Sequence, residues 1–277
     1  MRVFLRHLWV LTTEELFDLA GRKRSMLTLL LYLVVLVSAM YWFSKVQRHF
    51  EPVTNVLAAA PQIEELKQML QKFELEDTVD FIIQLSHYPA ALWMFQLFSL
   101  LWLPTVVGLV SCDMVAIDID RGTLRFVLQR SSRLAYYLAK LMAHFLLFAG
   151  LQLVGMIGLV AICGVTVAQF KLADYAGLGA LYFTVAVPFI FFVVASTAWV
   201  SSWTRKPMSA IVRLNVLWVV FFIMLGWWPH LSPLASTSMV GLFLPFDRYM
   251  WSSVGALTAW GSGFAALGLA GFLRRDV

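Results

Sequence analysis

The chain contains six long apolar stretches, and none of its 37 Asp, Glu, Lys and Arg residues falls inside them. A helix needs about 20 mostly apolar residues to cross about 30 Å of hydrocarbon. The stretches are residues 26–44, 88–112, 141–169, 175–203, the shorter 214–228, and 250–273. Because 61% of the residues are hydrophobic and only 13% are charged, a soluble fold could not bury the apolar surface, and disorder is excluded. We therefore expect an all-α membrane protein with six transmembrane helices.

The Lys and Arg residues gather on one side of these predicted spans. The N-terminus, the loops 113–140 and 204–213, and the C-terminus together hold 15 basic residues, against 6 on the opposite side. Cytoplasmic segments of membrane proteins carry the excess of Lys and Arg. We therefore expect a multi-pass membrane protein with both termini in the cytoplasm. The same placement accounts for the net charge of +5 without a nucleic-acid partner.

Residues 1–25 are predicted to form an amphipathic helix at the cytoplasmic interface of the membrane. Phe4, Leu8 and Leu11 share one face at helical spacing. Thr12 followed three residues later by Glu15 is a capping-box pattern, which predicts that a helix begins at Thr12. A soluble helix with ordinary core contacts is the alternative to the interfacial one.

Residues 26–277 are predicted to form one six-span transmembrane domain. Its outer segment 45–87 is expected to be a helical cap with a helix after Pro61, and an acidic ligand site or cation gate is the alternative for this segment. The polar and aromatic stretch 229–249 is a candidate for re-entering the membrane from the outer side. In the last span, Gly255, Ala259 and Gly263 recur every four residues, which predicts a close helix-packing seam.

The connection 113–140 between the second and third spans has the most specific pattern. Gly122 is predicted to end one helical segment, and Thr123 to begin a short second one. On that second segment Leu124, Val127 and Leu128 share a face at helical spacing. A short amphipathic helix that projects between two spans is suited to a groove on a soluble partner.

Several short motifs follow one another along the segments on the basic side. Arg121-Gly122-Thr123-Leu124 is followed by Ser131-Ser132-Arg133 and by Lys140 at the next span, while Glu14-Glu15-Leu16 precedes Arg22-Lys23-Arg24 and the chain ends with Phe272-Leu273-Arg274-Arg275-Asp276-Val277. Together these motifs resemble the type-2 ABC exporter permeases. The chain departs from the family pattern at two points: it has Asp118 and Asp120 where Glu usually precedes Gly-Thr, and it lacks the Pro-Val of Pro-Val-Ser-Arg.

The resemblance implies a permease subunit in the plasma membrane, the inner membrane of a bacterium, that forms the translocation path of an ATP-driven exporter. It also implies pairing with a second permease, as a homodimer or a heterodimer. It also implies a coupling helix in the loop 113–140 that contacts a separate cytoplasmic ATPase. The expected coupling residues are Gly122, Thr123, Leu124, Phe126, Val127, Leu128 and Arg130. No cofactor is expected on this chain, since ATP and Mg²⁺ would bind to the ATPase.

The sequence lacks the motifs for chemistry of its own. A phosphate-binding loop needs Gly-Lys, a dipeptide that does not occur in this chain, and no His is followed by the Glu of a His-Glu-x-x-His metalloprotease motif. One alternative is a membrane enzyme in which Asp118 and Asp120 hold a divalent metal at the cytoplasmic face. We expect no metal site, because two carboxylates at this spacing are common by chance. Another alternative is a membrane anchor for an ATPase without transport.

Three polar side chains, Gln96, Gln152 and Asn215, lie inside the predicted spans. Leaving such groups unpaired in lipid is costly. They are expected either to form hydrogen bonds between helices or to line the translocation path.

Overall fold

The computed structural model describes residues 2–59, 89–167, 170–204, 206–227 and 250–274, and every element in these ranges is an α-helix. The helices are α1 (Arg2–Gly21), α2 (Lys23–Ala59), α5 (Ala90–Ser111), α6 (Ala116–Asp120), α7 (Leu124–Leu128), α8 (Arg133–Thr166), α9 (Leu172–Trp203), α10 (Pro207–Trp227) and α12 (Met250–Leu273). The expected helix after Pro61 and the expected re-entrant stretch 229–249 lie outside the described residues.

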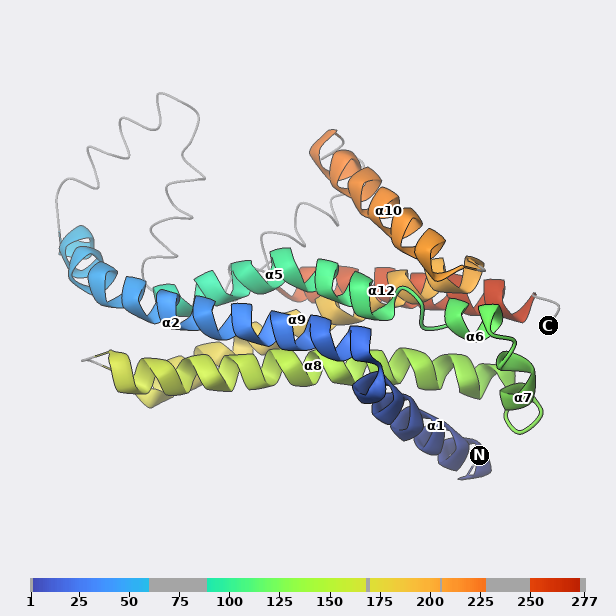
Figure 1. Ribbon diagram of the computed structural model, residues 1–277. Coiled ribbons are helices and arrows are strands. Elements are labelled where there is room, and N and C mark those ends of the chain that lie inside the picture. The colour runs from blue at the N-terminus through green and yellow to red at the C-terminus, as the bar shows by residue number, and fades with distance from the viewer. Residues whose placement is uncertain (1, 60–88, 168–169, 205, 228–249, 275–277) are drawn as a thin grey trace.

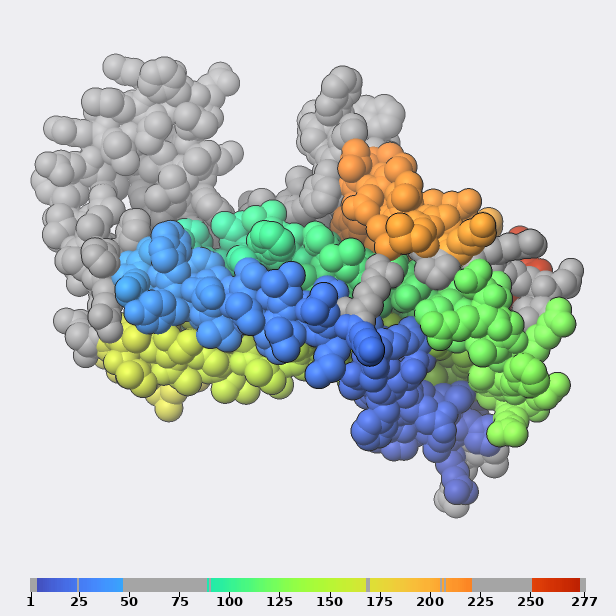
Figure 2. Space-filling view, in the orientation of Figure 1, coloured from blue at the N-terminus to red at the C-terminus, as the bar shows by residue number. Residues whose placement is uncertain are grey.

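Five long helices, α2, α5, α8, α9 and α12, run side by side in one bundle (Figure 1). The helix α9 is extensively buried and packs against α12, α8 and α5. Its sequence is apolar on all sides, as expected for a helix surrounded by other helices. The shorter α10 contacts the bundle near its first residues and then diverges from it (Figures 1 and 2).

The structure confirms an all-helical protein with several helices suited to a membrane. Within the described residues, five helical segments are long and apolar enough to cross one: Ser25–Val46, Ala91–Asp120, Arg133–Thr166, Leu172–Trp203 and Trp251–Leu273. The predicted span 214–228 falls on α10, whose described apolar part, Met208–Val220, is shorter than a span. A sixth crossing therefore stays a prediction.

Two helices extend beyond the predicted spans. The helix α2 continues to Ala59, into the segment expected to form the outer cap. The helix α8 begins at Arg133, because Ser132 is its N-cap and accepts a hydrogen bond from the backbone N–H of Ala135 at 3.2 Å. The connection after α5 is therefore shorter than the predicted loop 113–140, and Lys140 lies inside a helix.

The predicted helix start at Thr12 is wrong. The helix α1 is continuous from Arg2 to Gly21, and the Thr12 hydroxyl donates to the backbone oxygen of Leu8 at 2.7 Å, one turn earlier in the same helix. A Thr side chain can bond either to a helix start or to the preceding turn. Phe4, Leu8 and Leu11 are partly buried on one face, as expected, and α1 packs against α8.

Close packing between α9 and α12 involves several glycines of α12, among them Gly261 and Gly268. A Cβ atom at Gly261 would lie 2.6 Å from Phe191 Cδ1, and one at Gly268 would lie 3.0 Å from Trp199 Cα. Real Cβ atoms essentially never come within 3.0 Å of another atom, and a distance of 3.0 Å to backbone is already tighter than usual, so the neighbouring groups would have to move. The seam between the two helices therefore requires glycine at these positions.

The predicted seam through Gly255, Ala259 and Gly263 does not meet another helix of this chain within the described residues, so it stays a prediction. All three residues are exposed, and nothing lies within 4 Å of a Cβ built at Gly255 or Gly263. Small residues occur on more than one face of α12, and their spacing alone does not say which face meets α9. The tertiary contact selects the face with Gly261 and Gly268.

Candidate functional site

The short helices α6 and α7 form a folded connection at one end of the bundle, the same end at which α1 begins and α12 ends (Figure 1). The buried hydroxyl of Ser201, on α9, accepts hydrogen bonds from the backbone N–H groups of Val115 and Ala116 at 3.1 and 3.2 Å. These bonds satisfy N–H groups at the start of α6 that have no partner within that helix. The connection is thereby fastened to the central helix of the bundle.

The turn between α6 and α7 depends on Gly122, whose φ of 69° lies in the left-handed region. Glycine has no Cβ and adopts this conformation without a steric penalty. The turn places Thr123 at the N-cap of α7, so the predicted break at Gly122 and the short helix after it are confirmed.

The apolar face of α7 turns toward the bundle. Leu124 is only 1% exposed, and Val127 and Leu128 pack against the core. The sequence predicts that a groove on a partner buries this face, whereas in this chain the bundle itself contacts it, and the coupling role of the three residues stays a prediction. An aliphatic face on so short a helix is buried by the nearest apolar surface, which here belongs to the protein itself.

The opposite face of the connection is exposed, and it carries one large aromatic side chain. Phe126 is 70% exposed. Arg121, Thr123, Arg125, Gln129 and Arg130 are exposed on the same connection. We call these six residues the Phe126 surface. Because Leu124 is buried in the core, the connection is held against the bundle, and the Phe126 surface lies on a structured segment.

A buried lysine joins three segments of the chain next to this connection. Lys140, on α8, is 5% exposed, and its Nζ lies 2.7 Å from Glu15 Oε2 on α1 and 2.7 Å from Asp118 Oδ2 on α6. The Tyr136 hydroxyl donates to the same Asp118 oxygen, and the Thr123 hydroxyl donates to Asp118 Oδ1 at 3.1 Å. We call these five residues the Lys140 cluster. It links the N-terminal helix, the connection and the bundle through charged groups that are mostly removed from water.

Arg22, in the gap between α1 and α2, extends this network. Its guanidinium lies 3.6 Å from Glu15 and 3.9 Å from Asp113, and it also pairs with Asp18. Burial of Arg22 favours its neutral form, but the three carboxylates Glu15, Asp18 and Asp113 together outweigh that effect and raise its pKa. Arg22 therefore stays charged and holds the end of α1 against the start of α6.

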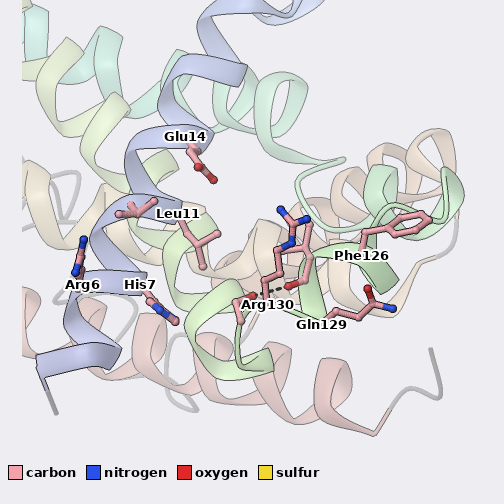
Figure 3. Close-up of a pocket in the computed structure, with 10 residues that line it drawn as sticks. Arg6, His7, Leu11, Glu14, Phe126, Gln129 and Arg130 are labelled. Atoms are coloured by element: carbon pink, nitrogen blue, oxygen red, sulfur yellow. Dashed lines mark hydrogen bonds between the residues drawn. The ribbon is translucent and has the colours of Figure 1, made fainter.

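A groove of about 450 Å³ separates the first half of α1 from α7 and the residues after it. Figure 3 shows His7, Leu11 and Glu14 on the α1 side, and Gln129 and Arg130 on the other side. Among the described residues, Arg6 and Arg130 form no ion pair, and Glu14 is the acidic residue that lines the groove. The groove is therefore lined by apolar side chains and by two arginines that a carboxylate of another molecule could contact.

The other predicted site residues lie elsewhere. Gln96 on α5 and Gln152 on α8 are buried in the bundle, and the structure shows no hydrogen bond for either side-chain amide within the described residues. Asn215 is exposed on α10, and its Nδ2 donates to the Ile211 backbone oxygen of its own helix at 2.9 Å. The fold thus does not bring these three residues to one place, and their part in a translocation path stays a prediction.

The alternative metal site at Asp118 and Asp120 gains no support. The Asp118 carboxylate is already bonded to Lys140, Tyr136 and Thr123, while Asp120 is exposed. The described residues contain no group of three or more His, Cys, Asp or Glu side chains able to hold a metal ion. A carboxylate held by a lysine is a poor ligand, because the metal would have to displace the lysine charge.

Sequence reasoning missed the partners of the Lys140 cluster. The sequence pattern places Glu15 in a capping box and Lys140 at the start of a span, and it pairs neither residue with the other. A signal was present, since Lys140 is a charge next to a long apolar run, and such a charge needs an acidic partner. The sequence could not say which of the acidic residues nearby in the chain would supply it.

Comparison with known proteins gives one finding. The family described as ABC-2 family transporter protein matches residues 15–245. A search of curated proteins finds no match. The matched range includes Glu15, the connection with the Phe126 surface, and Lys140.

Proposed function

The chain belongs to the ABC-2 family of transporter membrane proteins, and from this premise we propose that it is the permease subunit of an ATP-driven exporter. Five apolar helices suited to a membrane support a role as the membrane component. ATP and Mg²⁺ would bind to a separate cytoplasmic ATPase, because this sequence has no phosphate-binding loop. The permease itself would then perform no chemistry and would supply the path and the coupling to the ATPase.

The observation that carries the proposal is the exposed Phe126 on an anchored, basic connection. Aromatic and arginine side chains supply much of the binding energy at protein interfaces, especially as one aromatic anchor within a polar rim. Phe126 is exposed on the same short connection as Arg121, Arg125 and Arg130, which are also exposed. We propose that the ATPase docks on the Phe126 surface. In this proposal Leu124, Val127 and Leu128 hold α7 in place instead of contacting the partner.

The groove between α1 and α7 would enlarge the same docking surface. It lies beside Phe126 and Arg130, both of which line it. An acidic side chain of the ATPase could pair there with Arg6 or Arg130, and an apolar one could contact Val10 and Leu11. The N-terminal helix α1 would then form part of the surface on which the ATPase docks.

The Lys140 cluster provides a route for movement. A shift of the connection would pull on Asp118, and through Lys140 it would reach both α8 and α1. ATP binding by the partner would change the balance between inward-open and outward-open states. The size of this shift is set by the difference between the partner's affinities for the two states. We propose two permease subunits in the complex, in a bacterial inner membrane, with both termini in the cytoplasm.

The experiment replaces Phe126 by Ala and measures binding of the ATPase, identified by mass spectrometry through its Gly-x-x-x-x-Gly-Lys-Ser/Thr loop. Loss of an aromatic anchor costs about 2 to 4 kcal/mol, which weakens binding about 30- to 1,000-fold. Trp251→Ala is the matched control, since Trp251 is also 70% exposed but lies at the opposite end of the bundle. Equal ATPase binding by the two variants would show that Phe126 is not the anchor.

A further inference from the structure

A cavity of about 380 Å³ lies between α5 and α10, inside the helical region that we assign to the membrane. It exists because α10 touches α5 closely at one point and then diverges. At that point a Cβ on Gly108 would come within 3.0 Å of Leu214 Cδ2. Past it, Val216, Val219 and Val220 are exposed, and the separation of α10 from the bundle is visible in Figure 2.

The walls of the cavity are apolar and aromatic. They include Leu100, Leu101, Leu109, Leu214 and Trp218, and no Asp, Glu, Lys, Arg or His is among the described residues that line it. A charged ligand would find no compensating charge there and would pay the cost of leaving water. The lining therefore selects for an uncharged molecule.

A few polar groups converge on this apolar space. Asn215 lines it, and the single hydrogen bond from Nδ2 to its own helix leaves the side-chain oxygen and one N–H available. The Thr105 hydroxyl also lines it. Pro104 lies inside α5 and has no N–H to donate, so the Leu100 carbonyl four residues earlier loses its helical partner. The Asn215 amide and the Thr105 hydroxyl can each donate or accept a hydrogen bond, and the Leu100 carbonyl oxygen can accept one.

We propose that this cavity is a substrate site and that its ligand is uncharged, largely apolar, and equipped with one or two hydrogen-bonding groups. A volume of a few hundred Å³, apolar walls and a few placed polar groups are the usual properties of a small-molecule site. The ligand would reach the cavity from the lipid through the gap beside α10. This inference rests on the proposed transport function and names the class of substrate.

The test uses photolabelling of the full-length permease in lipid nanodiscs, without the ATPase. The probe is 4-(hydroxymethyl)benzophenone, and 4-benzoylbenzoate is its anionic counterpart. Mass spectrometry then locates the adducts. We expect the uncharged probe to label the α5 and α10 residues of the cavity, and the anionic probe to label them much less.

Three variants define the polar contacts. Thr105→Val keeps the side-chain shape and Asn215→Leu removes the amide, and each should lower labelling of the cavity by the uncharged probe about three- to tenfold, the effect of losing one hydrogen bond. Thr258→Val is the matched control. Thr258 is exposed on α12 and bonded to its own helix, so its loss should leave labelling unchanged.

Three results would overturn the proposal. Equal labelling of the cavity by both probes would show that it does not select against charge. Labelling spread evenly over the exposed helices would show partition into lipid alone. A Val219→Cys variant that cross-links two permease copies while the cavity stays unlabelled would show that a second subunit covers it. None of these results concerns Phe126 or ATPase binding, so the permease assignment is tested separately.

Discussion

Replacing Lys140 by methionine would leave two buried carboxylates facing each other without the cation between them. Lys140 Nζ lies 2.7 Å from both Glu15 and Asp118, and removing one member of a buried ionic group costs about 3 to 5 kcal/mol. Part of the loss is offset, because Arg22 stays 3.6 Å from Glu15 and two hydroxyls still donate to Asp118. We therefore expect a cost near the lower limit, about 3 kcal/mol.

The assay is hydrogen exchange of the α1 amides in the purified permease in nanodiscs, together with thermal unfolding. Because α1 meets the bundle through Glu15 and Arg22 as well as apolar contacts, the loss should appear first as local opening of α1. A cost of about 3 kcal/mol corresponds to exchange about 100-fold faster where local opening governs protection. Exchange in α9, which has no part in the cluster, should change little.

Two further variants test the cause. Lys206→Met removes an exposed lysine and should leave α1 unchanged. Lys140→Met combined with Glu15→Met and Asp118→Asn should recover most of the protection, because no unpaired buried charge remains at these three positions. If Lys140→Met alone leaves both exchange and unfolding as they were, the cluster does not hold α1 and the reasoning fails.

Gly268→Ala should destabilise the protein by about 1 to 3 kcal/mol, since the new methyl group would meet the Tyr137 hydroxyl on α8 and the Trp199 backbone on α9. Gly263→Ala, at an open position, should be neutral, and equal unfolding temperatures for the two variants would refute the close packing of α12 at Gly268. Topology can be tested with single cysteines introduced at Gln129 or at Lys171 after the buried Cys112 and Cys163 have been replaced. On intact cells, an impermeant thiol reagent should label only the cysteine at position 171. Labelling at 129 alone would reverse the proposed orientation.

The sequence by itself determined the class of the fold. Long runs without charge can only be helices in a membrane or in a core of helices, because every backbone group must be satisfied within the segment. The break at Gly122 was also local, since a positive φ follows from the lack of a Cβ. These features depend on a few neighbouring residues, and so they could be inferred from the sequence alone.

Only the tertiary structure decided which faces meet. On α7, periodicity identified the apolar face formed by Leu124, Val127 and Leu128, but not whether the bundle or a partner buries it. On α12, spacing identified small residues, but Gly268 and not Gly263 contacts α9. Lys140 pairs with Glu15 on α1 and with Asp118 on α6, two separate elements of the chain. A helical pattern fixes the angle between residues on one helix, whereas contact depends on how helices rotate and pack against each other, which no single segment encodes.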